Sequence, residues 1–173
     1  WKGENGKKVS LAEAVAAADC GKIYLMLGVN ELGWKGTDIF RGHAENLIRR
    51  LKADHPDAEL VIQSLLPVST EQDAKGSYVN NQRILAYNQV WRELAEENGC
   101  AYVDVAEALT GGAGCLPAEL SFDGVHLNRA GCRLWLDYLR THSVAGKVPG
   151  ESASQPESAE ASPAPEPSAT EQP

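Results

Sequence analysis

The chain has 173 residues, 43% of them hydrophobic, and a formal net charge of -8 at pH 7. This length predicts one domain plus whatever its tail adds. The acidic balance argues against a nucleic-acid partner, because no basic stripe is present that could replace the counterions of a phosphate backbone. No run of about 18 apolar residues exists, so no transmembrane segment is expected. The chain starts at Trp1 with no signal peptide, which indicates processing or a piece of a longer protein.

The N-terminal part predicts a connector, a short helix and a buried strand. Residues 1–8 are polar and lack periodicity. Ser10 and Glu13 form a capping-box pattern, which predicts a helix from Leu11 to about Ala18. Residues 22–27 are almost all apolar, as is typical of a strand buried on both faces, and Gly28 ends that strand.

The rest of the ordered chain alternates helices and strands. Two further strands are expected at 59–66 and 100–105. Helices are expected at 38–53, 82–98 and 129–141, with a single turn at 106–109 and a long polar loop at 68–81. This order predicts an α/β fold, a flavodoxin-like three-layer α/β/α arrangement with a parallel sheet. The strand at 22–27 should expose an apolar edge that has no partner.

Two helix faces are expected to pack inward. In the helix at 38–53 this face holds Ile39, Phe40, Leu47, Ile48 and Leu51. In the last helix it holds Leu134, Trp135, Tyr138 and Leu139.

The composition changes at Val144, beyond which Pro, Glu, Ser and Ala dominate and aromatic residues are absent. Such a segment cannot bury enough apolar surface to offset its chain entropy, so disorder is expected from about Lys147 to Pro173. The predicted organisation is therefore a domain at 1–143 and a tail at 144–173. Tails of this kind occur as spacers on cell-surface proteins, which favours a secreted or cell-envelope location, and also as plain linkers.

The four cysteines show no C-x-x-C pair and no metal-ligand spacing with histidine, so neither a metal site nor a cofactor is expected. Cys100 and Cys132 are interpreted as small core residues. Cys115 lies in a glycine-rich loop and should be the most accessible. Whether Cys115 and Cys132 are bonded to each other is left open by the sequence.

The first candidate site is the segment from Asp123 to His126, directly before the last helix. The spacing lets one Asp123 oxygen reach the Nδ1 hydrogen of His126, which fixes the tautomer and leaves Nε2 free as a base. Alone, the pattern also fits a simple turn at Asp123 and Gly124 followed by a helix cap at Asn128.

The second candidate is Asn30, just beyond the carboxyl end of the strand at 22–27. Ligands of open α/β sheets bind beyond such ends. A side-chain amide is a neutral donor that suits an oxyanion without perturbing a nearby base. Asn30 could equally do no more than close a turn.

Together these segments resemble the SGNH hydrolases, also called the GDSL esterase and lipase family. Gly28-Val29-Asn30-Glu31 is similar to the family's third block, Gly-x-Asn-Asp, and Asp123-Gly124-Val125-His126 is similar to its fifth block, Asp-x-x-His. The resemblance extends from about Ile23 to Thr141. It implies that Asp123 and His126 are catalytic, that Asn30 belongs to the oxyanion hole, and that Gly28 and Glu31 support the loop.

The sequence departs from the family pattern in two ways. Glu31 stands where the family usually has Asp. No Gly-Asp-Ser block, which supplies the nucleophile, and no second-block glycine occur before Lys22. The resemblance therefore implies an N-terminally truncated SGNH fold.

The function expected from this resemblance is hydrolysis of small acyl esters by a serine esterase, carbohydrate O-acetyl groups included, with no activity in this chain alone. The only partner expected is a small ester substrate. Acyl transfer and the oligomeric state stay open. One alternative is a non-catalytic module on the same scaffold that binds carbohydrate or another partner. Another is an unrelated flavodoxin-like domain, in which Asn30 and His126 would lie far apart.

Overall fold

The computed structural model describes residues 6–110 and 113–142, and its architecture is α/β, as the sequence predicted. The sheet has three parallel strands in the order β1 (Lys22–Leu25), β2 (Glu59–Gln63) and β3 (Ala101–Val103). The predicted tail at 144–173 and the domain boundary at 143 lie outside the described residues, so both stay predictions.

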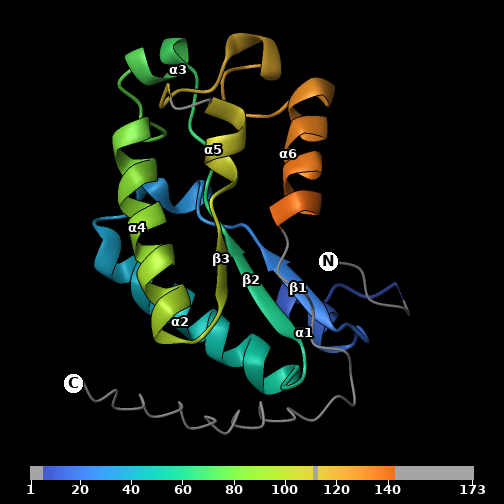
Figure 1. The fold of residues 1–173 in the computed structure, drawn as a ribbon. Coiled ribbons are helices and arrows are strands. Elements are labelled where there is room, and N and C mark those ends of the chain that lie inside the picture. The colour runs from blue at the N-terminus through green and yellow to red at the C-terminus, as the bar shows by residue number, and fades with distance from the viewer. Residues whose placement is uncertain (1–5, 111–112, 143–173) are drawn as a thin grey trace, which may run out of the picture.

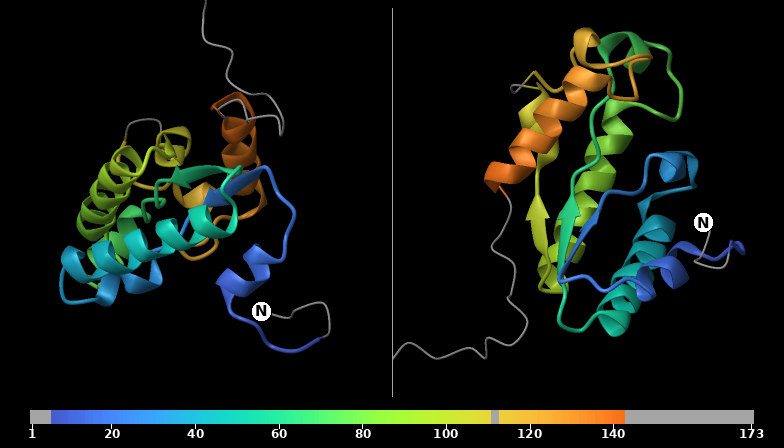
Figure 2. Two further views of the ribbon diagram at one scale, coloured as in Figure 1. Left: turned by 90° about the horizontal axis from the view of Figure 1, so that it is seen from below. Right: turned by 90° about the vertical axis from the view of Figure 1, so that its right-hand side faces the viewer.

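Helices cover both faces of the sheet, which gives the three-layer arrangement (Figures 1 and 2). One layer holds α1 (Leu11–Ala16), α2 (Thr37–Asp54) and α4 (Asn81–Glu97), and the other holds α5 (Val105–Thr110) and α6 (Arg129–His142). Three short elements lie in the connections: η1 (Asn30–Gly33), α3 (Thr70–Ala74) and η2 (Ala118–Leu120).

The central strand β2 divides its side chains between the two layers. Ile62 belongs to the main core cluster, which also contains Trp91 of α4. Val61 points to the opposite layer and packs in a cluster that Trp135 of α6 borders. This alternation is what a strand with helices on both faces requires, and it explains why the segment reads as a continuous apolar run.

All three strands are shorter than the sequence predicted, and side chains of α4 explain this for two of them. Asn88 accepts a hydrogen bond from the Leu65 amide at 2.7 Å and donates one to the Leu65 carbonyl at 2.9 Å. Trp91 Nε1 donates to the Leu27 carbonyl at 2.8 Å. The Leu27 carbonyl and both backbone groups of Leu65 are therefore bonded to a helix instead of to the sheet, while Ser64, directly after β2, still donates to the Val103 carbonyl at 3.0 Å.

The predicted helix starts are mostly confirmed. Ser10 accepts a hydrogen bond from the Glu13 amide at 3.2 Å, and the Glu13 carboxylate accepts one from the Ser10 amide at 2.7 Å, which completes the capping box of α1. Asn80 caps α4 through its side chain. Helix α2 begins one residue earlier than predicted, at Thr37, with Gly36 as its N-cap residue.

The prediction of a continuous loop at 68–81 is wrong, since α3 lies within it. Ser69 caps this helix by accepting a hydrogen bond from the Gln72 amide at 3.2 Å. The helix is five residues long and buries none of them, so it has no hydrophobic periodicity that a sequence reading could detect.

Two side chains expected to pack inward are exposed instead. Ile39 in α2 is 49% exposed, next to the buried Phe40, because adjacent helix positions lie about 100° apart around the axis. Leu134 in α6 is 46% exposed. The contacts of α6 with the sheet run along Trp135, Tyr138 and Leu139, and Leu134 lies at the border of this stripe.

The outer edge of β1 has no strand partner within the described ranges 6–110 and 113–142, as the sequence predicted. Tyr24 and Leu27 are 41% and 40% exposed beside it. A groove of about 690 Å³, lined by Tyr24, Met26, Trp135, Leu136 and other residues, lies between this edge and α6. We call this surface the β1-edge groove. An unpaired edge next to apolar surface favours further strand pairing.

We predict that Asn88→Ala lowers the free energy of unfolding by roughly 2–3 kcal/mol, because both backbone groups of Leu65 lose their partners in a buried position. Urea unfolding checks this value. Gln89→Ala is the matched control, since its exposed side chain bonds only to Glu93, and its change should stay within about 0.5 kcal/mol. Equal losses in the two variants would contradict the prediction.

Candidate active site

The loop after β1 places Asn30 at the carboxyl end of the sheet. Gly28 has a φ of 133°, a value that side chains other than that of glycine rarely allow. A Cβ at this position would lie 3.2 Å from the Phe40 ring and 3.3 Å from Leu65. The chain then turns into η1, whose first residue is Asn30. Gly28 is therefore needed for both its conformation and the close approach of the core.

Glu31 contributes to this loop through its backbone. Its amide donates to the Gly28 carbonyl at 3.1 Å, and its own carbonyl accepts from the Trp34 amide at 2.9 Å. The same carbonyl also accepts from the Tyr87 hydroxyl at 2.6 Å, so the hydrogen bonds that the structure gives Glu31 are made by its backbone. A change from Asp to Glu at this position is compatible with such contacts.

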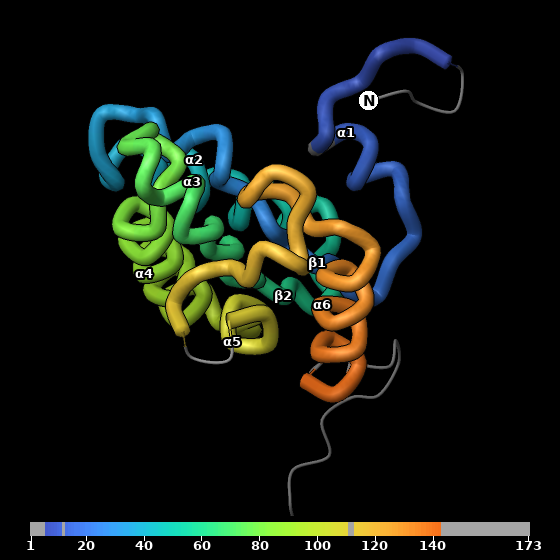
Figure 3. The backbone as a smooth tube through the Cα atoms, turned by 90° about the horizontal axis from the view of Figure 1, so that it is seen from above, coloured from blue at the N-terminus to red at the C-terminus, as the bar shows by residue number. Residues whose placement is uncertain are grey.

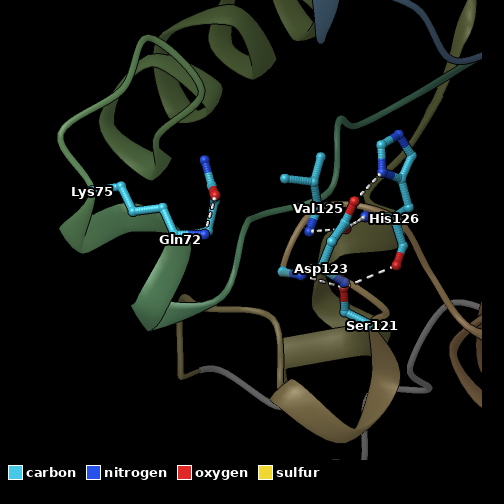
Figure 4. Close-up of polar contacts among 7 residues, drawn as sticks. Gln72, Lys75, Ser121, Asp123, Val125 and His126 are labelled. Atoms are coloured by element: carbon cyan, nitrogen blue, oxygen red, sulfur yellow. Dashed lines mark hydrogen bonds and ion pairs between the residues drawn. The ribbon is translucent and has the colours of Figure 1, made fainter.

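Asp123 and His126 form the pair that their spacing predicted. His126 Nδ1 donates to Asp123 Oδ2 at 2.8 Å, while Asp123 Oδ1 accepts from the amides of Val125 and His126 at 2.9 and 2.8 Å (Figure 4). Nε2 of the imidazole is left available as a base. The His126 and Asp123 side chains are 77% and 52% exposed.

Ser121 closes the turn that carries this pair. Its hydroxyl accepts hydrogen bonds from the amides of Gly124 at 2.8 Å and Asp123 at 3.3 Å, and it donates to the His126 carbonyl at 2.9 Å (Figure 4). No pattern in the sequence indicated a role for this serine. Its partners are all within five residues, so the turn is largely closed by its own side chains.

Gly124 fixes this turn against the N-cap residue of α3. Its carbonyl accepts a hydrogen bond from the Ser69 amide at 2.8 Å. Its φ is 84°, and a Cβ there would lie 2.4 Å from Ser69 Oγ. Only glycine satisfies both conditions. Seen from above, the loop passes over the ends of β1 and β2 on its way to α6 (Figure 3).

Asn30 and His126 line one cavity of about 440 Å³. Gly28 and Val125 from the two loops also line it, and so do Cys132 and Trp135 from α6. The expectation of an unrelated fold, in which Asn30 and His126 would be far apart, does not agree with this arrangement. An amide donor and an imidazole around one apolar cavity can stabilise an oxyanion and transfer a proton.

The sequence model of the GDSL-like lipase/acylhydrolase family matches residues 5–134, more than half of the chain. The chain belongs to this family. The resemblance deduced from the two short motifs is therefore confirmed at the level of the family, and the family fold agrees with the three-layer architecture.

Several solved structures resemble this GDSL family member. A protein of Streptococcus pneumonia provisionally assigned as a platelet activating factor is 30% identical with a TM-score of 0.63, over 70% of this chain and 58% of that one. Axe2, an acetylxylan esterase from Geobacillus stearothermophilus, is 19% identical with a TM-score of 0.60, over 77% and 64%. A peptidoglycan O-acetylesterase is 17% identical with a TM-score of 0.59, over 75% and 39%.

The GDSL family member thus spans less than two thirds of each of these three structures. A comparison with curated protein sequences found no match.

Within the part of the chain that the structure describes, no group of three or more His, Cys, Asp or Glu side chains could hold a metal ion. No helix in that part is long and apolar enough to cross a membrane.

Two cysteines differ from the predicted exposure, and one of them lines this cavity. Cys132, predicted to be a core residue, is exposed and lines the cavity at the start of α6. Cys115, predicted to be the most accessible, is half-buried, and Asn81 Nδ2 donates to its sulfur at 3.4 Å. All four cysteines are free, so Cys115 and Cys132 are not bonded. The cause is the orientation of α6, which the sequence does not fix.

The hydrogen bonds to Asp123 lower the pKa of its carboxyl group, so it stays ionised at acidic pH. The amide of His126, then its imidazole, then the amide of Val125 hold the pKa of Asp123 well below its usual value of about 3.9. Because this pKa is lower in the folded than in the unfolded chain, the ionised group stabilises the fold above about pH 4. That contribution is lost as the pH falls toward the folded pKa.

We predict that the carboxyl carbon of Asp123 keeps the NMR shift of the ionised form at about pH 3, where an ordinary aspartate is mostly protonated. Asp123 in the urea-unfolded chain is the control. It should titrate near the unperturbed aspartate pKa of about 3.9. A folded-state midpoint equal to the unfolded one would contradict the assigned hydrogen bonds.

Proposed function

We propose that this chain supplies the acid-base pair and the oxyanion donor of an SGNH-type serine esterase that acts on small acyl esters. The observation that carries the proposal is that Asn30 and His126 line one cavity, with Asp123 bonded to the far side of the imidazole. Family membership supports an ester hydrolase in general terms. The roles of the individual residues are the proposal.

In the reaction, His126 Nε2 takes the proton of a serine hydroxyl while the serine oxygen attacks the ester carbonyl. The tetrahedral intermediate places its negative oxygen where the Asn30 amide donates a hydrogen bond. Asp123 stabilises the imidazolium. The imidazolium then gives its proton to the departing alcohol, and the same nitrogen activates the water that releases the acid.

The serine is proposed to come from a segment outside the residues of this chain. Among the described residues that line the cavity, none carries a hydroxyl group. The outer edge of β1, which has no strand partner among residues 6–110 and 113–142, and the β1-edge groove offer one surface on which a further strand and helix can pack. The limited coverage of the related structures supports this placement.

The substrate is proposed to carry a short acyl group, with carbohydrate O-acetyl groups as the first class to test. The cavity is lined in part by branched apolar side chains, those of Val29, Val68, Ile84 and Val125. A cavity of about 440 Å³ fits small molecules better than long chains. Two structures of similar fold are named as esterases of acetylated xylan and of peptidoglycan O-acetyl groups.

The alternative is a non-catalytic module that binds a carbohydrate or another partner on the same scaffold. The lack of a hydroxyl group among the described lining residues favours it for this chain in isolation. The gene sequence before Trp1 distinguishes the two proposals. The esterase proposal predicts a serine that follows a strand there, and the binding module predicts none.

We predict that this chain alone hydrolyses p-nitrophenyl acetate no faster than its His126→Ala variant, because none of the described residues that line the cavity carries a hydroxyl group. Release of p-nitrophenol checks this. Cys132→Ala is a second control, since its thiol lines the same cavity. Turnover that exceeds the His126→Ala rate and is lost in Cys132→Ala would show that Cys132 supplies the nucleophile and would sink the proposal of an external serine.

In the chain extended by the residues encoded before Trp1, we predict that Asn30→Ala lowers kcat about 100- to 1000-fold, the usual effect of losing one oxyanion donor. Steady-state kinetics on an acetyl ester measure this. Asn46→Ala is the control, because Asn46 is exposed on α2 and bonds to Arg49. Unchanged kcat in Asn30→Ala would rule out its role as the oxyanion donor.

A further inference from the structure

Three side chains of α4 donate hydrogen bonds to the loop that carries Asn30. Arg83, Tyr87 and Trp91 are four residues apart in turn, so they lie along one face of the helix. Their acceptors, in the same order, are the backbone carbonyls of Leu32, Glu31 and Leu27. The loop is therefore held on both sides of Asn30 by one rigid element.

We propose that Tyr87, with Arg83 and Trp91 beside it, is a positioning residue that holds Asn30 at a fixed place on the cavity wall. Its catalytic consequence depends on the proposed function, but the positioning itself does not. No feature of the motif around Asn30 indicates this role, because the donors lie more than 50 residues further along the chain.

Tyr87 is suited to this role by its surroundings. Its hydroxyl donates to the Glu31 carbonyl at 2.6 Å, and the residue as a whole is 3% exposed. The ring stacks on Phe40 with centroids 4.2 Å apart. Burial raises the pKa of the hydroxyl, which keeps it protonated as a donor. The side chain is therefore held in one orientation, with its hydroxyl directed at the Glu31 carbonyl and its ring against Phe40.

The core blocks movement of the loop in the other direction. Phe40, which packs on Tyr87, also lies against Gly28, where a Cβ would be 3.2 Å from its ring. Tyr87 and Trp91 thus prevent the loop from moving outward, and Phe40 prevents it from moving inward. An oxyanion donor is effective only when it is held in place before the reaction, and a displacement of about 1 Å can cost about 100-fold in rate.

The α4 donors also make the loop independent of any segment outside the chain. Each of the three hydrogen bonds joins residues that the structure describes. We therefore expect the Asn30 loop to be ordered in this chain as it stands. The order of this loop can be measured on the chain in that form, and the measurement requires no enzymatic activity.

The test is amide hydrogen exchange by NMR in the full chain, compared with its Tyr87→Phe variant. We expect exchange at Glu31 and Trp34, whose amides close the η1 turn, to become at least tenfold faster. The order parameter of the Asn30 amide should fall from about 0.85, the value of rigid backbone, toward about 0.6. The amides at the centre of β2, such as Val61 and Ile62, should exchange at unchanged rates, which separates local release from general destabilisation.

Tyr138→Phe is the matched control, because it removes a tyrosine hydroxyl that donates to Glu107 on the other side of the sheet. It should leave the exchange of Glu31 and Trp34 unchanged. Arg83→Gln is a second variant for the case that Tyr87→Phe does not fold, and it should accelerate exchange at the same two amides. Wild-type exchange and order in the η1 turn of both variants would overturn the proposal.

Failure of the proposed function gives a different result. In the chain extended before Trp1, Tyr87→Phe should lower kcat at least threefold with KM unchanged if Asn30 is the oxyanion donor. Faster exchange of the η1 amides without any esterase activity would leave the positioning role intact and remove only the esterase assignment.

Discussion

The hydrogen bond from the Ser69 amide to the Gly124 carbonyl joins the chain beyond β2 to the loop that carries His126. Val125, the next residue, also packs against the main core cluster, so the two contacts together fix the last loop relative to the sheet. The contact demands glycine, because any Cβ at position 124 would collide with Ser69 Oγ at 2.4 Å. Once Gly124 is in contact, the turn closed by Ser121 and Asp123 holds the imidazole at the cavity formed beyond the strand ends. Asn30 and His126 thereby line the same cavity, although they are almost a hundred positions apart in the sequence.

The site is built in two halves, each held by elements of this chain. Side chains of α4 hold the loop of Asn30, and the capped end of α3 holds the loop of His126. Neither half relies on the outer edge of β1, which has no strand partner in the part of the chain that the structure describes. This separation explains how a GDSL family member that spans 58% of a related chain can still present an ordered imidazole and amide. The same edge, with the apolar groove beside it, is the natural surface on which additional chain would complete the sheet.

The parts of the fold and site that could be predicted are those determined locally. The Asp123–His126 bond joins residues three apart, and the Ser10–Glu13 capping box does the same, so spacing alone predicts both. The position of Asn30 follows from a buried strand that ends at glycine. The family resemblance added the link between the two segments.

The parts that could not be predicted depend on contacts between distant segments. Helix α3 has no apolar face, and its cap at Ser69 matters only because Gly124 packs there. The exposure of Cys132 depends on how α6 is rotated over the sheet, which no local pattern encodes. The hydrogen bonds from Tyr87 and Trp91 reach carbonyls, and backbone acceptors carry no sequence signal.

The most direct measurement of the central claim is a crystal structure of the chain extended before Trp1, after reaction with an alkyl phosphonate that mimics the tetrahedral intermediate. The account predicts a phosphonylated serine in the cavity, with a phosphoryl oxygen roughly 2.7–3.1 Å from Asn30 Nδ2 and His126 Nε2 beside the serine oxygen. A phosphonate bound to a residue outside the cavity, or one whose oxygen faces away from Asn30, would contradict it.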